Sequence, residues 1–346
     1  MKKSSKTFSH FKKIHCRGDK MATIKEVAKK AGVGIATVSR VVNKSGYVKE
    51  ETRKKIEEVI KEVGYKPNEI ARSMLRQKSH LVAFVLPNNT HLFFGELLYE
   101  LEQILFQDDY KVMVCNSSED MKKELEFINM LKNNRVDSLV LLTNNDIEDQ
   151  IDPKLPIVSF DRRLEGVPYV ASDNYGGGQM AAKLLLDAGC KKFMFVGDDA
   201  QGESTPIKTE VSKRRIGFLE YLHQHGIEEV VNYEYHLGNY LIKPEVVSDL
   251  IKNNLDVEGI FAISDAVAFA IIKELEKRGK RVPEDVKVIG FDGGRSFLNS
   301  GKRITSIGQS PKDIAKALRN TITNLYEKKE ATDQIVPIYY AKGDTL

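Results

Sequence analysis

Residues 22–79 read ATIKEVAKKAGVGIATVSRVVNKSGYVKEETRKKIEEVIKEVGYKPNEIARSMLRQKS and hold the clearest periodicity in the chain. Apolar residues spaced i, i+3, i+4 and i+7 predict a first helix with one buried stripe: Ile24, Val27, Ala28 and Ala31. Thr23 and Glu26 have the spacing of a capping box, which begins a helix, and Gly32 is suited to ending it. The segment therefore opens with a short amphipathic helix.

A second apolar stripe follows a tight Gly-Val-Gly turn, at Val38, Val41 and Val42. The opposite face of this second helix mixes polar and apolar residues: Ile35, Ala36, Ser39, Arg40 and Asn43. Two short helices joined by a tight turn, the second with such an outer face, predict a helix-turn-helix. On periodicity alone, the alternative is an ordinary helical hairpin.

The positive charge of the chain is concentrated at its amino-terminal end. Residues 21–79 contain 14 Lys and Arg against 7 Asp and Glu, and residues 1–20 contain 7 against one. Because the whole chain carries +4, residues 80–346 must carry −9. A basic head on an acidic body is typical of a protein whose head contacts phosphate. Since the basic head coincides with the predicted helix-turn-helix, the two observations together favour DNA binding.

Two segments, AGVGIATVSRVVN (31–43) and TRKKIEEVIKEVGYKPNEIARSM (52–74), closely resemble the DNA-binding head of the LacI/GalR family of bacterial transcription regulators. The resemblance implies that Ile35, Ala36 and Arg40 meet operator base edges. Apolar side chains suit thymine methyl groups, and an Arg can form a bidentate pair with guanine. An apolar pair at the start of the recognition helix looks more like the gal-type branch of the family than the lac type.

The same resemblance implies that Thr37, Ser39 and Asn43 sit against phosphates, which fixes the register on DNA without reading sequence. The other DNA-binding residues that we expect are Thr23, Tyr47, Asn68, Arg72 and Met74. The chain departs from the family pattern at Gly34 and Lys49, where Ser is usual, so two hydroxyl groups that would cap helices are missing. The domain boundaries that we expect here are 21–66 for the helix-turn-helix domain and 67–79 for a hinge helix.

The predicted hinge helix is too short to be stable alone in water, because helix nucleation is costly and few hydrogen bonds follow it. In the family this segment orders when two copies pack together in the operator's minor groove. Met74 takes the place of the Leu that wedges between base pairs there, and a Met can serve as an apolar wedge. The alternative is a plain interdomain linker with an incidental Met.

Composition sets modest bounds on the rest of the chain. Its 346 residues suggest two or three domains, and its three Cys form no metal-binding spacing and no even framework, which favours a reduced cytoplasm. No apolar run reaches transmembrane length, and the first 20 residues lack the apolar centre of a secretory signal. We expect residues 1–20 to be a disordered basic extension or the product of a mis-annotated start.

The body, residues 80–346, alternates short apolar runs with amphipathic helical runs, a pattern that predicts parallel sheet covered on both faces. The predicted strands are LVAFVLP, KVMVCNS, SLVLLTN, PIVSFDR, KKFMFVG, GIFAISD, VKVIGFDG and ITSIG. These are too many for one comfortable sheet. The resemblance implies two flavodoxin-like, doubly wound α/β subdomains with a ligand cleft between them, as in periplasmic binding proteins. The expected N-subdomain is about 80–173 plus 309–334, and the C-subdomain about 174–308 plus 335–346.

Ligands of open parallel sheets bind outside the carboxyl ends of the strands, so polar residues at those ends are candidates for an effector site. The resemblance implies that Asp161, Arg214 and Asp292 hydrogen-bond the hydroxyls of a small effector. It also places Tyr240 where an aromatic ring stacks on the effector. Other candidates for effector contact are Arg162, Ser264, Asp265 and Phe94. Each Asp has the alternative role of capping a helix, and Phe94 that of core packing.

The segments NSSED, LPIVSFDR, SDNYGGGQMAAKLLLDAG and VPEDVKVIGFDG look most like sugar-operon repressors of Gram-positive bacteria, of the sucrose and ribose types. The resemblance implies a cytoplasmic homodimer on a palindromic double-stranded operator, with release when a sugar in the cleft separates the hinges. The alternative within the family is a global catabolite-control regulator acting with a corepressor.

Two more remote functions have little support in the sequence. A sugar-binding receptor would carry a signal sequence and no basic head. An α/β sugar enzyme would need a phosphate loop, a GxGxxG after a strand, or a nucleophile with its base. The run Gly176-Gly177-Gly178 has the wrong spacing, and the seven His are scattered without a metal-binding pattern. We therefore expect no enzyme activity, cofactor, metal or membrane contact.

Overall fold

The computed structural model describes residues 22–65, 78–198, 209–235, 242–293 and 303–346. The chain divides into two compact units, Met1–Gln77 and Lys78–Leu346. Within the described ranges, no helix combines the length and the apolar character needed to cross a lipid bilayer.

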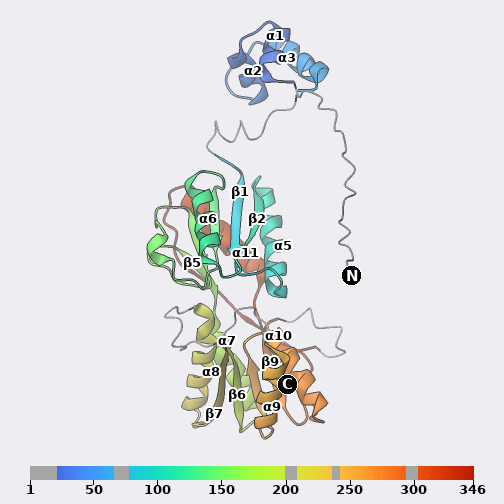
Figure 1. The fold of residues 1–346 in the computed structure, drawn as a ribbon, viewed down its shortest axis with the longest axis vertical. Coiled ribbons are helices and arrows are strands. Elements are labelled where there is room, and N and C mark those ends of the chain that lie inside the picture. Colours follow the sequence, from blue (N-terminus) through green and yellow to red (C-terminus); the bar gives the residue numbers. More distant parts are fainter. Residues whose placement is uncertain (1–21, 66–77, 199–208, 236–241, 294–302) are drawn as a thin grey trace, which may run out of the picture. The chain divides into compact units, whose positions relative to one another are not determined.

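The described residues of the first unit form three helices (Figure 1): α1 (Ile24–Ala31), α2 (Ile35–Val42) and α3 (Glu50–Val63). The predicted capping box is confirmed, because Thr23 Oγ1 accepts from the Glu26 amide at 3.3 Å and Glu26 Oε2 accepts from the Thr23 amide at 2.7 Å. Gly32 ends α1 with a left-handed φ of +66°, which a glycine adopts without steric cost.

The predicted apolar stripes meet in one small core beneath these helices. Its buried residues are Val27, Ala28, Ala31, Val38, Val41, Val48, Ile56 and Val59. Because the buried stripes of α1 and α2 face this core, the polar and mixed faces of both helices point outward.

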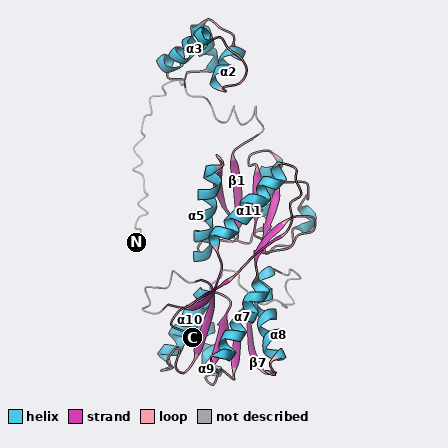
Figure 2. Ribbon diagram, turned by 180° about the vertical axis from the view of Figure 1, so that it is seen from behind, coloured by secondary structure: helices cyan, strands magenta, loops and turns pink. Residues whose placement is uncertain are grey.

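The second unit contains two six-stranded sheets, shown from opposite sides in Figures 1 and 2. The first has the order β11-β5-β4-β3-β1-β2 and is parallel throughout. Its strands are β1 (Leu81–Leu86), β2 (Lys111–Asn116), β3 (Ser138–Leu141), β4 (Ile157–Phe160), β5 (Tyr169–Ser172) and β11 (Gln334–Val336).

The second sheet repeats this order as β12-β10-β9-β8-β6-β7, with β12 antiparallel to β10 at one edge. Its strands are β6 (Phe193–Asp198), β7 (Val230–Tyr235), β8 (Gly259–Ala262), β9 (Lys287–Asp292), β10 (Thr305–Gly308) and β12 (Tyr339–Ala341). Each sheet thus has the strand order of a doubly wound, flavodoxin-like fold, so the predicted fold class is confirmed.

Helices cover both sheets: α5 (Leu92–Gln107), α6 (Met121–Lys132), α7 (Asn174–Asp187), α8 (Lys213–Gln224), α9 (Pro244–Asn253), α10 (Asp265–Lys277) and α11 (Pro311–Tyr326). Two short 3-10 helices are η1 (Glu148–Gln150) and η2 (Glu210–Ser212). In β1, Val82 and Phe84 pack in the core formed with α5 and α11, whereas Ala83 and Val85 pack in the core formed with α6. A strand that is buried on both faces in this way appears in the sequence as a continuous run of apolar residues.

The chain crosses between the two sheets after β5, after β10, and between β11 and β12. Hydrogen bonds join these crossings: Ser172 Oγ to Gln309 Oε1 at 2.6 Å, and the Asp173 amide to the Val336 carbonyl at 2.9 Å. The last crossing follows β11, which pairs with β5 as far as Val336, so the first sheet extends to that residue.

Candidate functional site

The outer face of α2 presents Ile35, Ala36 and Arg40 to solvent, and Ile35 is 47% exposed. Ala36 and Arg40 are four residues apart and share one side of the helix. The Arg40 side chain lies beside Gly46, where an added Cβ would be 3.5 Å from Arg40 Cδ. The three predicted base-contacting side chains are thus accessible on one short helix, as insertion into a major groove requires.

The other predicted DNA-binding residues include Thr37, Ser39 and Asn43, which we expect to contact phosphates. Thr37, Ser39 and Asn43 are half-buried, and Asn43 Nδ2 donates to Ser39 Oγ at 3.1 Å. Tyr47 is 85% exposed. Thr23 is exposed but already uses its hydroxyl oxygen to cap α1. Asn68, Arg72 and Met74 lie outside the described residues.

The two departures from the family pattern leave helix ends without side-chain caps. Within the described ranges, neither Gly34 at the start of α2 nor Lys49 at the start of α3 caps its helix with a side-chain hydrogen bond. The first amide groups of α2 therefore keep their capacity to donate to an oxygen from outside the chain. A phosphate is suited to that position, because helix amino termini favour negative charge.

A pocket lies in the second unit at the carboxyl ends of both sheets. It encloses about 40 Å³ and is lined by His91, Phe93, Phe94, Asp161, Val211, Arg214, Ile263, Ser264, Asp292 and Gln309. These residues come from segments that follow β1, β4, β8, β9 and β10 and from the start of α8. Among the described residues, no cluster of three His, Cys, Asp or Glu is placed to hold a metal ion. The pocket thus offers two carboxylates, one guanidinium and aromatic walls.

The two pocket carboxylates stand on strained backbone. Asp161 follows β4 with φ +53°, and Asp292 ends β9 with φ +112°. Residues other than glycine rarely adopt positive φ, and such strain clusters at binding sites. The Asp161 backbone is held on both sides, because its amide donates to the Val170 carbonyl at 3.0 Å and its carbonyl accepts from the Glu210 amide at 2.9 Å.

Burial controls the charge of these carboxylates. It raises the pKa of Asp161 to about 7, with Glu210 and Asp292 adding to the rise and Arg214 opposing it. Burial likewise raises the pKa of Asp292, against the opposing effects of His91, Arg214 and a hydrogen bond from Gln309. No described residue hydrogen-bonds to Asp161 Oδ1, which is buried. A buried acceptor of this kind is suited to a hydroxyl donor from a ligand.

Arg214 is held on three sides by the second sheet and its helices. Its Nε donates to Asn174 Oδ1 and its Nη1 to the Ile263 carbonyl, both at 2.7 Å. The guanidinium carbon lies 3.5 Å from the centre of the Phe291 ring. With its carbon over an aromatic face and two donors engaged, the guanidinium has a fixed orientation at the pocket.

Two glycines let α8 approach α7 closely enough to bring Arg214 to the pocket. An added Cβ at Gly178 would lie 2.0 Å from the Arg214 carbonyl oxygen, and one at Gly217 would lie 2.1 Å from the Tyr175 carbonyl oxygen. Either contact would force the two helices apart. The glycine run whose spacing excludes a phosphate loop therefore serves helix packing.

His91 and Gln309 complete the surroundings of Asp292, and sequence analysis missed both. His91 Nε2 lies 3.7 Å from Asp292 Oδ2, and Gln309 Nε2 donates to Asp292 Oδ1 at 2.7 Å. Gln309 follows β10, so the rule that polar residues at strand ends form sites could have found it. His91 precedes α5 after a loop, and that rule does not reach it.

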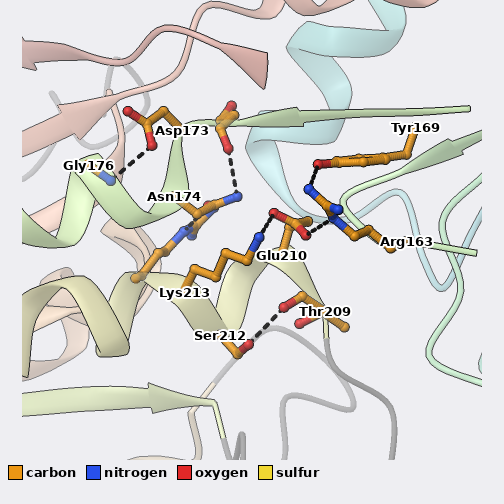
Figure 3. Close-up of polar contacts among 11 residues, drawn as sticks. Arg163, Tyr169, Asp173, Asn174, Gly176, Thr209, Glu210, Ser212 and Lys213 are labelled. Carbon is orange, nitrogen blue, oxygen red and sulfur yellow. Dashed lines mark hydrogen bonds and ion pairs between the residues drawn. The ribbon is translucent and has the colours of Figure 1, made fainter. Parts of the chain in front are cut away.

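An ion network beside the pocket links the segments that follow β4 and precede α8 (Figure 3). Glu210 is 5% exposed, and its carboxylate receives Arg163 Nε at 3.2 Å and Lys213 Nζ at 2.6 Å. Arg163 also donates to the Tyr169 hydroxyl, and its guanidinium carbon lies 4.7 Å from the centre of that ring. Arg163 and Tyr169 belong to the part of the chain that forms the first sheet, and Glu210 belongs to the part that forms the second. The network therefore joins the two sides of the pocket, one from each sheet.

Some of the other predicted effector-contacting residues line the pocket and others do not. Ser264 and Phe94 line the pocket, although Ser264 also caps α10 and Phe94 is part of the core. Arg162 does not line the pocket, because its guanidinium turns away and donates to the Thr143 and Asn145 carbonyls. Asp265 is also absent from the lining: it is buried in the first turn of α10, against Gly290. Tyr240 lies outside the described residues.

Comparisons with known proteins match both units. Residues 23–68 match the model for bacterial regulatory proteins of the lacI family, and residues 79–310 match the model for periplasmic binding proteins and the sugar binding domain of the LacI family. The chain is 35% identical to a sucrose operon repressor from Streptococcus mutans serotype c over 332 residues, which are 94% of this chain and 100% of that protein.

A second relative indicates the same family, and a solved structure has a similar fold. The chain is 33% identical to the ribose operon repressor of Bacillus subtilis strain 168, with 92% and 97% of the two chains covered. The solved structure of the lac repressor dimer bound to operator and the anti-inducer ONPF matches the fold with a TM-score of 0.80 at 20% identity, covering 94% of this chain and 99% of that one. The chain belongs to the LacI family of bacterial regulatory proteins, which are DNA-binding transcription regulators rather than enzymes.

Proposed function

We propose that this protein is a cytoplasmic repressor of a sugar-utilisation operon, released from a palindromic operator by a small neutral sugar. The buried Asp161 carboxylate carries the proposal, because its Oδ1 receives no hydrogen bond from a described residue while it lines a pocket with Arg214 and Asp292. Similarity to sucrose and ribose operon repressors supports the same class of effector.

The charges of the pocket favour a neutral polyol over a sugar phosphate. Asp161 and Asp292 face one buried guanidinium, that of Arg214. An anionic ligand would add a further negative charge to a site where burial already disfavours ionised carboxylates. Hydroxyls of a neutral sugar can instead donate to the carboxylates and accept from the guanidinium.

A thermal-shift screen tests this class of effector. We expect sucrose, ribose or a related neutral sugar to raise the melting temperature of the core, because a ligand that binds the folded state stabilises it by mass action. Glucose 6-phosphate and fructose 1,6-bisphosphate serve as anionic controls and should give no shift. Stabilisation by the phosphates alone would contradict the proposal, and a sugar that tightens operator binding would favour a corepressor mechanism instead.

The size of the pocket indicates how a sugar would act. A volume of about 40 Å³ is far below the roughly 300–1,000 Å³ of pockets that enclose small molecules, so a sugar requires the two walls to separate or rotate. We propose that this motion alters residues 67–79 and releases DNA. Such coupling is reciprocal, so operator must weaken sugar binding by the same factor. Calorimetry that gave equal sugar affinity with and without operator would contradict the mechanism.

We propose that a second copy of the chain binds an apolar stripe on α5 and the adjacent edge strand β2. Leu92, Tyr99 and Phe106 recur every seven residues on α5 and are 49%, 63% and 67% exposed, and Val114 of β2 is 41% exposed. A stripe of exposed large apolar residues marks an interaction surface, and the solved relative is a dimer. Phe106→Glu should shift sedimentation from dimer to monomer; an unchanged dimer would place the interface elsewhere.

A further inference from the structure

The first residues of the second unit are held by one buried carboxylate. Asp137, which is 8% exposed, accepts from the Ser79 amide at 2.6 Å, the Ser79 hydroxyl at 2.9 Å and the His80 amide at 2.9 Å. The Ser79 hydroxyl oxygen also accepts from the Leu81 amide at 3.2 Å, and the Asp137 amide donates to the Leu81 carbonyl at 2.8 Å. The start of β1 and the loop before β3 therefore hold each other.

His80 fixes the same segment from a second direction. Its backbone has φ +56°, and its carbonyl accepts from the Lys111 amide at 2.9 Å. Its Nδ1 lies 3.1 Å from the Asp109 carbonyl oxygen in the turn between α5 and β2. The His80 and Tyr110 rings have centroids 5.4 Å apart. A left-handed backbone at a non-glycine residue persists where its surroundings determine it.

Aromatic contacts extend this attachment to α11. The Tyr110 and Tyr326 rings have centroids 5.9 Å apart, and Lys78 Nζ lies 5.6 Å from the centre of the Tyr326 ring. Burial raises the pKa of Tyr110 to about 12, with the charges of Asp137 and Asp108 adding to the rise. Residues of the α6–β3 loop, the α5–β2 turn and the end of α11 thus hold residues 78–80 in place. All three segments belong to the first sheet and its helices.

We propose that Asp137 is a positioning residue for operator binding, which fixes Ser79 and His80 to the first sheet so that any rotation of that sheet reaches the preceding segment. The inference rests on the proposed function, in which a sugar in the pocket rotates the sheets. Three hydrogen bonds to one buried carboxylate restrain two successive residues at once. Without this restraint, residues 78–80 can change conformation when the sheet rotates. The rotation is then not passed on to the segment that precedes them.

The position of the attachment supports a transmitting role. The pocket lies at the carboxyl ends of the strands, whereas Ser79 and His80 precede the amino end of β1, at the other end of the same parallel sheet. Figure 1 shows the chain entering β1 at that end. Asp137 is not one of the residues that line the pocket, so a substitution at Asp137 can change the effect of sugar on DNA binding without changing the sugar site itself.

The test compares Asp137→Asn with wild type and with Asp120→Asn, a matched control. Asp120 also accepts a backbone amide, that of Lys122 at 2.9 Å, but at the opposite end of the first sheet. Asn at 137 keeps one acceptor and turns an NH₂ group toward a donor. The probes are sucrose, or ribose where sucrose gives no thermal shift, and a labelled duplex selected by the wild-type protein from a random library. Sugar affinity comes from calorimetry, and operator affinity with and without sugar from fluorescence anisotropy.

We expect Asp137→Asn to bind sugar within about twofold of wild type, while the ratio of operator affinities without and with sugar falls at least about fivefold from a typical value of 5 to 150. Ser79→Ala, which removes one of the three hydrogen bonds, should reduce the ratio less and keeps the test valid if Asp137→Asn does not fold. An unchanged ratio, or an equal fall in Asp120→Asn, overturns the inference. A wild-type ratio of one overturns the proposed function itself.

Discussion

The DNA-binding face and the effector pocket are built in opposite ways. On α2, Ile35, Ala36 and Arg40 come from six consecutive residues and are exposed. In the pocket, Asp161, Arg214 and Asp292 are separated by tens of residues and enclosed by two sheets. A short helix is enough to present the first group. The second group exists as a site because five strand ends and one helix start converge.

This difference predicts how each region responds to mutation. An exposed side chain on α2 contributes little to folding, so its loss should affect DNA binding alone. A charged side chain in the pocket is removed from water, so its loss leaves other buried charges without compensation. Function and stability are therefore separable on α2 and inseparable at the pocket.

The largest effect is expected for Arg214→Ala, which leaves the Asp161 and Asp292 carboxylates together in a buried site without their cation. The free energy of unfolding of the core should fall by about 3–5 kcal/mol, as calorimetry of the core transition measures. Arg281→Ala is the control, because its pair with Asp285 is on the surface, where water screens the two charges, and its loss should cost far less. Equal losses of unfolding free energy in the two variants would contradict the proposal that the pocket charges matter more for stability than surface charges do.

On α2, Arg40→Ala should weaken binding to the specific operator by about 5- to 150-fold, the equivalent of about 1–3 kcal/mol for a lost bidentate contact with guanine. The melting temperature of the core and its response to sugar should not change. Lys44→Ala, in the exposed turn after α2, should weaken specific and nonspecific binding alike and lower the salt slope by about one. An Arg40→Ala variant that kept its operator preference would remove Arg40 from the base-reading face.

The pocket should also respond to pH through Asp161. Its pKa is about 7 in the folded protein against 3.8 in the unfolded chain, so the folded state holds the proton more tightly. The contribution of Asp161 to stability is therefore greatest at low pH, falls as pH rises toward 7 and is constant above it. The difference in unfolding free energy between wild type and Asp161→Asn should fall by on the order of 2 kcal/mol from pH 5 to pH 8.

Asp313→Asn provides the control for this pH profile. Hydrogen bonds from Lys316 and Ser310 lower the pKa of Asp313, so its contribution to stability is present above pH 3.8 and is lost only as pH falls further. Between pH 5 and pH 8, its difference from wild type should be flat. A flat profile for Asp161→Asn as well would mean that Asp161 is ionised throughout this range.

The smallest effect is expected for Gly34→Ser, which restores the missing hydroxyl at the start of α2. An added Cβ at Gly34 meets no atom within 4 Å, so the substitution fits without rearrangement. A Ser cap should stabilise the first unit by a few tenths of a kcal/mol over Gly, measured by the thermal loss of α2 amide signals in NMR. Gly34→Ala, which adds the carbon without the hydroxyl, should give no gain; an equal gain would rule out capping as the cause.

Much of the fold could be predicted because its signals are local. The capping box at Thr23 and the apolar stripes of α1 and α2 require only a few adjacent residues, and the structure confirms them. Strands buried on both faces are continuous apolar runs, which is why β1 and β8 are evident. Sequence analysis missed the strands β5, β7, β11 and β12, and the helix α8, whose run KRRIGFLEYLHQ mixes charge with a glycine at a packing contact.

By itself, the sequence determined the helix-turn-helix, its exposed reading residues and the two-sheet class, since helix and strand periodicity depend on neighbouring residues. The tertiary structure decided which strand-end residues meet. It turned Arg162 toward two carbonyls, placed Asp265 behind Gly290, and brought His91 and Gln309 to Asp292. It also attached Ser79 and His80 to Asp137, 57 or more residues away. These outcomes depend on side-chain direction and burial, which the packing of distant segments sets and local pattern does not.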